Sequence, residues 1–169
     1  NRVMIFANLL QAYQNLSKTA TGYVVRKGWR DSNVAPTDNS PLAYMIFRAS
    51  EAFLNYMEAD CMKNGGNSID ANSQKYWKAL RKRAGVSDNY QLTIDNTDLN
   101  KENDLAVWSG NKQISKMLYN IRRERRCEFI AEGMRKDDLF RWRSLDKMKD
   151  YTVEGFNWEK YKEQIYYKE

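Results

Sequence analysis

Apolar residues recur at steps of three and four along two stretches in the first half of the chain, a spacing typical of amphipathic helices. The first stretch runs from Pro41 to Gly65, and proline suits the first turn of a helix. The second begins near Ser68, where Asp70 favours a helix start, and ends at Gly85. Only a short turn separates the two stretches, so the pattern predicts an antiparallel helical hairpin.

A similar pattern predicts a second pair of helices further along the chain. We expect one long helix from Lys112 to Glu132, which Gly133 interrupts or ends, and a shorter helix that opens at Asp137–Asp138. Residues 86–111, between the two pairs, are polar and predict a connector with at most a short turn of helix. The expected fold class is therefore all-α, with tetratricopeptide-like helical hairpins joined by long irregular connections.

The N-terminal part of the chain gives a less regular pattern. Residues 1–16 suit either a helix or a buried strand, and the pattern does not decide between them. Residues 17–41 hold both prolines and many Ser, Thr, Asn and Asp residues, which predicts an irregular segment with a short strand or hairpin at Tyr23–Val25. We expect a single domain over residues 1–169, with a helical core at 41–145, an irregular segment at 1–40 and a C-terminal extension at 146–169.

The composition excludes several classes of function. The chain contains no histidine, which removes Ser–His and Cys–His catalytic arrangements and the usual zinc ligand. It also lacks glycine-rich phosphate-binding motifs and a CxxC pair, so we expect no catalytic residue, no metal and no cofactor. Cys61 and Cys127 each fall in a helical pattern and are expected to be buried free thiols. No apolar run is long enough to span a membrane.

The segment Ile121–Trp142 has the arginine content of a nucleic-acid-binding helix, but acidic residues alternate with the basic ones. On a helical projection, Arg125 and Glu128 continue the apolar stripe of Ile121, so charges occupy positions that face the core. An unpaired buried charge costs several kcal/mol, which favours a network of ion pairs between helices. Nucleic-acid binding and a carboxylate site of another kind remain as alternatives.

The helix predicted after Pro41 shows the same arrangement of charges. Charged residues lie beside its apolar stripe at steps of three and four residues. The side chains expected to form the structural ion-pair network are Arg48, Glu51, Glu58, Arg81, Arg83, Glu124, Arg125, Glu128, Glu132, Arg135 and Asp138.

Three segments in this order resemble the SusD/RagB family. The segment Phe47–Asp60, FRASEAFLNYMEAD, is similar to the family's Arg-x-Ala-Glu-x-x-Leu-x-Tyr-Ala-Glu-Ala helix, although Ser50 and Met57 replace small residues. The segment Tyr76–Val86, YWKALRKRAGV, resembles the family's Asn-x-Val-Arg-x-Arg-Ala-Gly pattern. The segment Ile121–Trp142, IRRERRCEFIAEGMRKDDLFRW, resembles the strongest signature, Ile-x-x-Glu-Arg-x-x-Glu-Leu-x-x-Glu-Gly-x-Arg-x-x-Asp-Leu-x-Arg-Trp.

The resemblance implies a non-enzymatic protein of the cell outer membrane. Members of the family are surface-exposed lipoproteins that bind glycans and work with a SusC-like TonB-dependent transporter. The matched segments correspond to the C-terminal portion of longer proteins, so we expect this chain to be a part of one. Contact with the membrane would then come only through a lipid anchor that is absent from this chain. In the family the ionic motif holds helices together, in agreement with the projection.

Glycan contacts in the family come from variable loops and depend on aromatic rings that pack against sugar rings. The aromatic residues in the expected loops of this chain are Tyr23, Trp29, Tyr90 and Trp108, and each could instead pack against its own scaffold.

Two rival functions stay open. Glu128 and Glu132 could serve as paired carboxylates of a glycosidase, but both lie beside Arg125, whose charge would keep them ionised, whereas a general acid needs a raised pKa. The other rival is a helical-repeat scaffold for protein–protein interaction, because stacked helix pairs commonly bind peptides.

Overall fold

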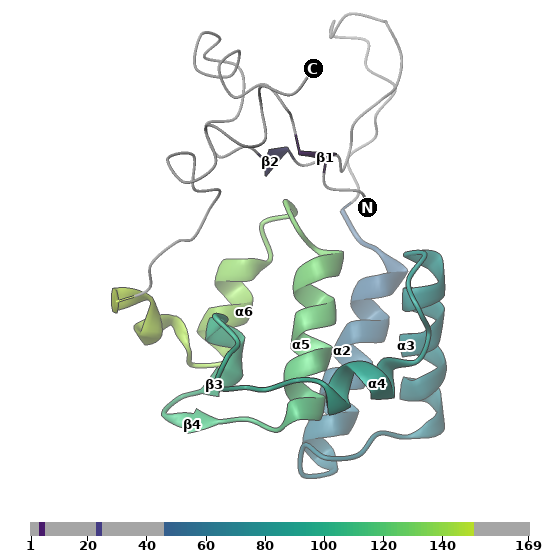
Figure 1. Ribbon diagram of the computed structural model, residues 1–169, viewed down its shortest axis with the longest axis horizontal. Coiled ribbons are helices and arrows are strands. Elements are labelled where there is room, and N and C mark those ends of the chain that lie inside the picture. Colours follow the sequence, from purple (N-terminus) through teal and green to yellow (C-terminus); the bar gives the residue numbers. More distant parts are fainter. Residues whose placement is uncertain (1–3, 6–22, 25–45, 151–169) are drawn as a thin grey trace, which may run out of the picture. The chain divides into compact units, whose positions relative to one another are not determined.

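The computed structural model describes residues 4–5, 23–24 and 46–150, and the chain divides into two units (Figure 1). Unit 1 comprises residues 1–42 and 151–169, and unit 2 comprises residues 43–150. In unit 1 the described residues form two short antiparallel strands, β1 (Met4–Ile5) and β2 (Tyr23–Val24). Met4 pairs with Val24 and Ile5 with Tyr23. Tyr23 thus lies in a strand, as its sequence predicts.

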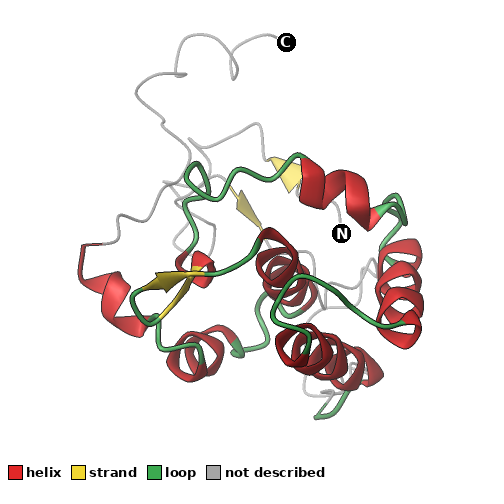
Figure 2. Cartoon of the chain, turned by 90° about the horizontal axis from the view of Figure 1, so that it is seen from below, coloured by secondary structure: helices red, strands yellow, loops and turns green. Residues whose placement is uncertain are grey.

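Unit 2 is mainly helical, which confirms the predicted fold class. Its longer helices stand side by side with nearly parallel axes in Figure 1, and Figure 2 looks along several of them. The elements are α2 (Ala49–Lys63), α3 (Ala71–Arg83), α4 (Tyr90–Asp95), the 3-10 helix η1 (Leu105–Val107), β3 (Trp108–Ser109), β4 (Lys112–Gln113), α5 (Lys116–Glu128), α6 (Arg135–Arg141) and the 3-10 helix η2 (Leu145–Asp150).

Helices α2 and α3 form the first predicted hairpin. Asp70 caps α3, its Oδ1 accepting the Ser73 N–H at 2.7 Å. Gly66 takes a left-handed φ of 84° after α2, and its N–H donates to the carbonyl of Cys61 at 2.7 Å. The predicted start of α2 at Pro41 is wrong for Ile46, Phe47 and Arg48, which lie before the helix, while residues 41–45 are outside the described part.

Helix α5 is shorter than predicted at both ends. Lys112 and Gln113 are not helical but form β4, which pairs antiparallel with β3. The helix begins after Ser115, whose Oγ accepts the Leu118 N–H at 3.1 Å. It ends at Glu128, and three residues later Ala131 takes a left-handed φ of 63°, which no α-helix continues through. A serine cap and a left-handed residue therefore override the apolar periodicity.

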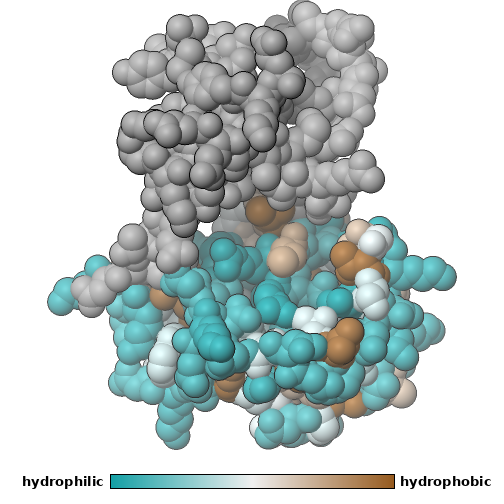
Figure 3. All heavy atoms as spheres, in the orientation of Figure 1, coloured by the Kyte–Doolittle hydropathy of each residue, from teal (hydrophilic) through white to brown (hydrophobic). Residues whose placement is uncertain are grey.

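The core of unit 2 lies where α2 packs against both α3 and α5. Its buried residues are Leu54, Met57, Cys61, Trp77, Leu80, Ile94, Leu118, Ile121 and Phe129. The outer surface of the described part is mostly hydrophilic, with isolated apolar patches (Figure 3).

The predicted burial of both cysteines is correct for Cys61 and wrong for Cys127, and both thiols are free. Cys127 is exposed because the opposite side of α5, with Leu118 and Ile121, is the side that packs on the core. Ile130, two residues after the end of α5, is also exposed.

Candidate functional site

The arginines of α5 reach partners on other helices. Arg125 is 5% exposed, and its Nε donates to both carboxylate oxygens of Asp138, on α6, at 2.8 Å each. Its Nη1 donates to the side-chain oxygen of Asn55, on α2, at 2.8 Å. The guanidinium also stands 5.0 Å from the centre of the Phe129 ring. One buried cation therefore ties three helices together.

Glu58 is the buried acceptor at the centre of this arrangement. It lies on α2, is 3% exposed, and accepts from the Trp142 Nε1 at 2.5 Å and the Arg141 Nη2 at 2.6 Å. The Nε of Arg122 lies 3.5 Å from Oε1 of Glu58, the oxygen that also accepts from Trp142. Two hydrogen-bond donors from the end of α6 and the charge of one arginine of α5 thus compensate one carboxylate of α2, as burial of a charge requires.

Arg122 is the most deeply buried arginine of the described residues, at 1% exposed. Its Nη1 donates to the carbonyls of Ala106 at 3.2 Å and Trp108 at 3.1 Å, and its guanidinium stands 4.4 Å from the centre of the Trp142 ring. Burial lowers the pKa of Arg122 to about 10, although the charge of Glu58 acts in the opposite direction. It therefore stays protonated at neutral pH.

Two acceptors on the second half of α5 bind the first hairpin. Glu124 accepts from the Trp77 Nε1 at 2.8 Å and from the Arg81 Nη1 at 3.1 Å, both on α3. Glu128 forms ion pairs with Arg83 and with Arg48, the latter at 2.7 Å. Both acids thus fix α3 and the start of α2 against α5.

The pKa of Glu128 follows from this setting. Burial acts to raise it, but the hydrogen bond and charge of Arg83 and the charge of Arg48 outweigh burial and hold the pKa of Glu128 below its ordinary value. Arg48 also pairs with Glu132 at 3.0 Å. These carboxylates are acceptors of ion pairs, and neither the charge nor the pKa of Glu128 suits a general acid.

Asp104 forms a further ionic centre in the connector that the sequence marked only as polar. It is 6% exposed, and it pairs with Arg126 of α5 at 2.9 Å and with Arg135 of α6. Its Oδ1 also accepts the Ala106 N–H at 2.9 Å, so it caps η1.

Two of the four predicted loop aromatics have described side chains, and the prediction that they lie in loops is wrong for both, because Tyr90 begins α4 and Trp108 begins β3. Tyr90 stacks on Trp77 with ring centres 4.4 Å apart and an angle of 7° between the planes. Trp108 is half-buried, and the Lys147 Nζ stands 5.7 Å from its ring centre. The side chain of Tyr23 and the whole of Trp29 lie outside the described residues.

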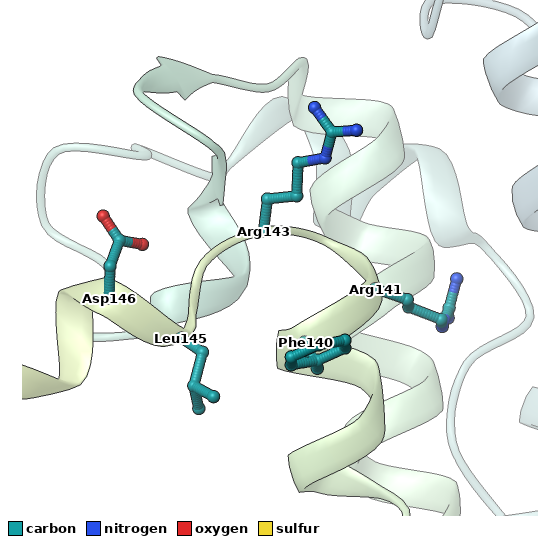
Figure 4. Close-up of a pocket in the computed structure, with 5 residues that line it drawn as sticks. All are labelled: Phe140, Arg141, Arg143, Leu145 and Asp146. Carbon is teal, nitrogen blue, oxygen red and sulfur yellow. The ribbon is translucent and has the colours of Figure 1, made fainter.

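An open depression of about 660 Å³ lies at the turn between α6 and η2 (Figure 4). Phe140, which is 72% exposed, and Leu145 point to one side of the turn, whereas the charged ends of Arg143 and Asp146 point to the other. The turn is held by a hydrogen bond of 3.0 Å from the N–H of Gly110 to the carbonyl of Arg143. Arg141, which also lines the depression, points away from Arg143 and Asp146, so the depression offers no converging set of ligand contacts.

The signature that runs from α2 to α6 is matched by the model of the SusD family over residues 2–169. The chain belongs to the SusD family. Neither a curated protein nor a solved structure matched the chain. The SusD family is one of glycan-binding proteins of nutrient uptake, and it is non-enzymatic.

Within the described part of this SusD-family chain, no helix is long and apolar enough to cross a bilayer. The same residues bring together no group of three or more acidic or cysteine side chains suited to a metal ion. The charged side chains described above instead form ion pairs and hydrogen bonds with one another.

The ionic centres include residues that the sequence prediction missed. Of the residues predicted for the network, Glu51 is the only one without an ion pair among the described residues. The missed partners are Arg122, Arg126, Arg141, Trp142 and Asp104. Arg141 and Trp142 end the family signature and could have been included on that ground. Asp104 sits in a polar connector with no periodic signal, so only the tertiary structure identifies it.

Proposed function

We propose that this chain is the C-terminal portion of a surface glycan-binding protein that serves nutrient uptake at the outer membrane. The observation that carries the proposal is the match to the SusD family over residues 2–169. The family signature lies on helices that contact one another through the side chains of Arg125, Glu58 and Glu128.

The ionic centres support a structural role for the signature and a non-enzymatic protein. Each buried carboxylate described above has at least two cationic or N–H donors, which stabilise its ionised form. A rigid helical framework of this kind can hold loops in place without taking part in ligand chemistry. Ligand contacts then belong to side chains outside the ionic centres, and we propose Tyr23, Trp29 and Trp108 as the first positions to test.

The partner that fits this function is a SusC-like TonB-dependent transporter in the same membrane. The longer protein would be held at the cell surface by a lipid anchor, and this chain would contribute part of the transporter-facing or glycan-facing scaffold. Co-purification of the full-length protein from outer membranes with a transporter of this type tests the partnership directly. Recovery of the full-length protein without any such transporter would contradict it.

The glycan-binding proposal is tested with a glycan array, followed by calorimetric titration of each glycan that binds. We expect one or a few related oligosaccharides to bind the folded protein. We also expect each bound oligosaccharide to be recovered chemically unchanged after incubation with the protein. Absence of binding to every glycan, together with binding of extended peptides in a parallel peptide array, would replace the proposal with a helical-repeat interaction scaffold.

A further inference from the structure

Helix α3 carries an unusual distribution of charge. Residues Ala71–Arg83 contain five basic side chains and no acidic one, whereas α2 and α5 carry charges of both signs. A basic last turn is common because it complements the helix dipole, but Lys75 and Lys78 lie before that turn. The charge of α3 therefore extends beyond what helix capping explains.

Three of these lysines form a line on the solvent side of the helix. Lys75, Lys78 and Lys82 are all exposed and are spaced three and four residues apart, so they share one face. Trp77 and Leu80, which are buried, occupy the opposite face. At 1.5 Å per residue the line covers about 10 Å of the helix axis. We call these three residues the lysine stripe.

The lysine stripe differs from the other cations of α3 in its contacts with the described part of the chain. The other two cations of α3, the largely buried Arg81 and the exposed Arg83, are paired with Glu124 and Glu128. Within residues 46–150 the lysine stripe enters no ion pair, in contrast to the arginines of α5. In Figure 1 α3 lies at the edge of unit 2, with α2 on its inner side. The lysine stripe is thus open to a partner.

The geometry favours a linear polyanion over other anionic partners. A compact phosphate needs donors that converge on one point, whereas the lysine stripe is spread along a helix. A membrane surface favours cations interleaved with exposed large apolar residues, but the other exposed residues of α3 are small or polar: Ala71, Asn72, Gln74 and Ala79, with Arg83 at its end.

We propose that the lysine stripe binds an acidic polysaccharide, a glycan chain that carries carboxylate or sulfate groups along its length. This inference rests on the proposed glycan-binding function and names the class of glycan. Binding releases counterions, so the affinity falls steeply with ionic strength, by about 20-fold to 40-fold for a fourfold rise in salt if three cations take part.

The test compares binding of dextran sulfate and of unmodified dextran to the complete chain of 169 residues. One variant combines Lys75→Gln, Lys78→Gln and Lys82→Gln. The matched control combines Lys112→Gln, Lys116→Gln and Lys136→Gln, which removes the same charge at exposed positions of β4, α5 and α6. We expect a loss of about tenfold or more in dextran sulfate affinity for the first variant and less than about twofold for the control.

A further variant with arginine at all three stripe positions is expected to keep the affinity, since its charge is retained. Melting curves of every variant establish that the fold is unchanged. Equal losses in the stripe variant and the control, or no dextran sulfate binding by the unmodified chain, would overturn the proposal. Equal affinity for an oligothymidylate or for anionic vesicles would overturn the assignment to a glycan.

The two proposals fail in different ways. If neutral array glycans bind the unmodified chain and the stripe variant equally, and dextran sulfate does not bind, the glycan-binding function stands and the lysine-stripe proposal is wrong. If dextran sulfate binds through the lysine stripe and no array glycan binds, the lysine stripe is a polyanion site and the proposed glycan-binding function is contradicted.

Discussion

Arg125 shows at the scale of one residue how a buried charge stabilises this fold. Its side chain is buried with that of Asp138, and the pair is surrounded by helices rather than water. Breaking a buried pair by removing one partner leaves the other charge without compensation, which costs more than the intact pair contributes. Asp138 is the partner of Arg125 because the packing of α6 against α5 brings the two side chains together.

Replacing Arg125 with methionine should lower the free energy of unfolding by about 3 kcal/mol, because Asp138 keeps only Arg141, which is more exposed. Urea unfolding followed by circular dichroism measures this loss. Lys136→Met, at an exposed position of the same region, serves as the control and should change stability by less than about 0.5 kcal/mol. An Arg125→Met loss as small as that of the control would place Arg125 in solvent.

Glu128 gives a pH-dependent prediction. Its pKa is lowered in the folded state, so its ion pairs add stability above its ordinary value of 4.5, and this stability is lost as pH falls through the folded pKa. We expect Glu128→Gln to be less stable than the unmodified chain at pH 7, and the difference to shrink as the pH falls below about 4.5. Urea unfolding at a series of pH values measures both proteins. A difference that is constant from neutral to acidic pH would contradict the ion pairs with Arg48 and Arg83.

The helix boundaries show what is decided at the scale of elements. Ser115 begins α5 by capping Leu118, and its hydroxyl also donates to the carbonyl of Gly66, in the turn after α2. The same side chain therefore sets the start of one helix and fixes the turn after another. Apolar periodicity alone placed the start at Lys112, because β4 continues the polar and apolar pattern without a helical backbone.

We expect Ser115→Ala to lower the free energy of unfolding by about 1 to 2 kcal/mol, since both the cap and the contact with Gly66 are lost. Thermal or urea unfolding gives the value. Ser68→Ala removes a hydroxyl from an exposed position in the same turn and should change stability by less than about 0.5 kcal/mol. Equal effects of the two substitutions would mean that Ser115 does not cap α5.

At the scale of the whole molecule, the signature of the SusD family is a set of contacts that close unit 2. Acids on α2 and α5 bind cations and indole N–H groups from α3, α5 and the end of α6. Any ligand site supported by this framework must use side chains outside these pairs. Tyr90, stacked on Trp77, belongs to the framework, whereas Trp108, on β3, is half-buried with part of its surface open.

This difference predicts opposite results for two substitutions. Tyr90→Ala should lower the melting temperature and leave glycan affinity nearly unchanged in the protein that stays folded, because its ring contacts Trp77. Trp108→Ala should weaken the binding of an array-selected glycan by about fivefold or more if it contributes a face to a sugar ring, and calorimetric titration measures this. Normal affinity of Trp108→Ala, with reduced affinity of Tyr90→Ala at unchanged melting temperature, would reverse the assignment.

The sequence by itself determined the helical class, the hairpin of α2 and α3, the cap at Asp70 and the types of residue that form the ionic core. These features depend on the helical period and on neighbours within one turn, which a local pattern records. Only the tertiary structure decided that Arg125 binds Asp138 and Asn55, and that Glu58 receives Arg141 and Trp142. Asn55 is separated from Arg125 by 70 positions and Trp142 from Glu58 by 84, so packing, and no local spacing, brings these partners together.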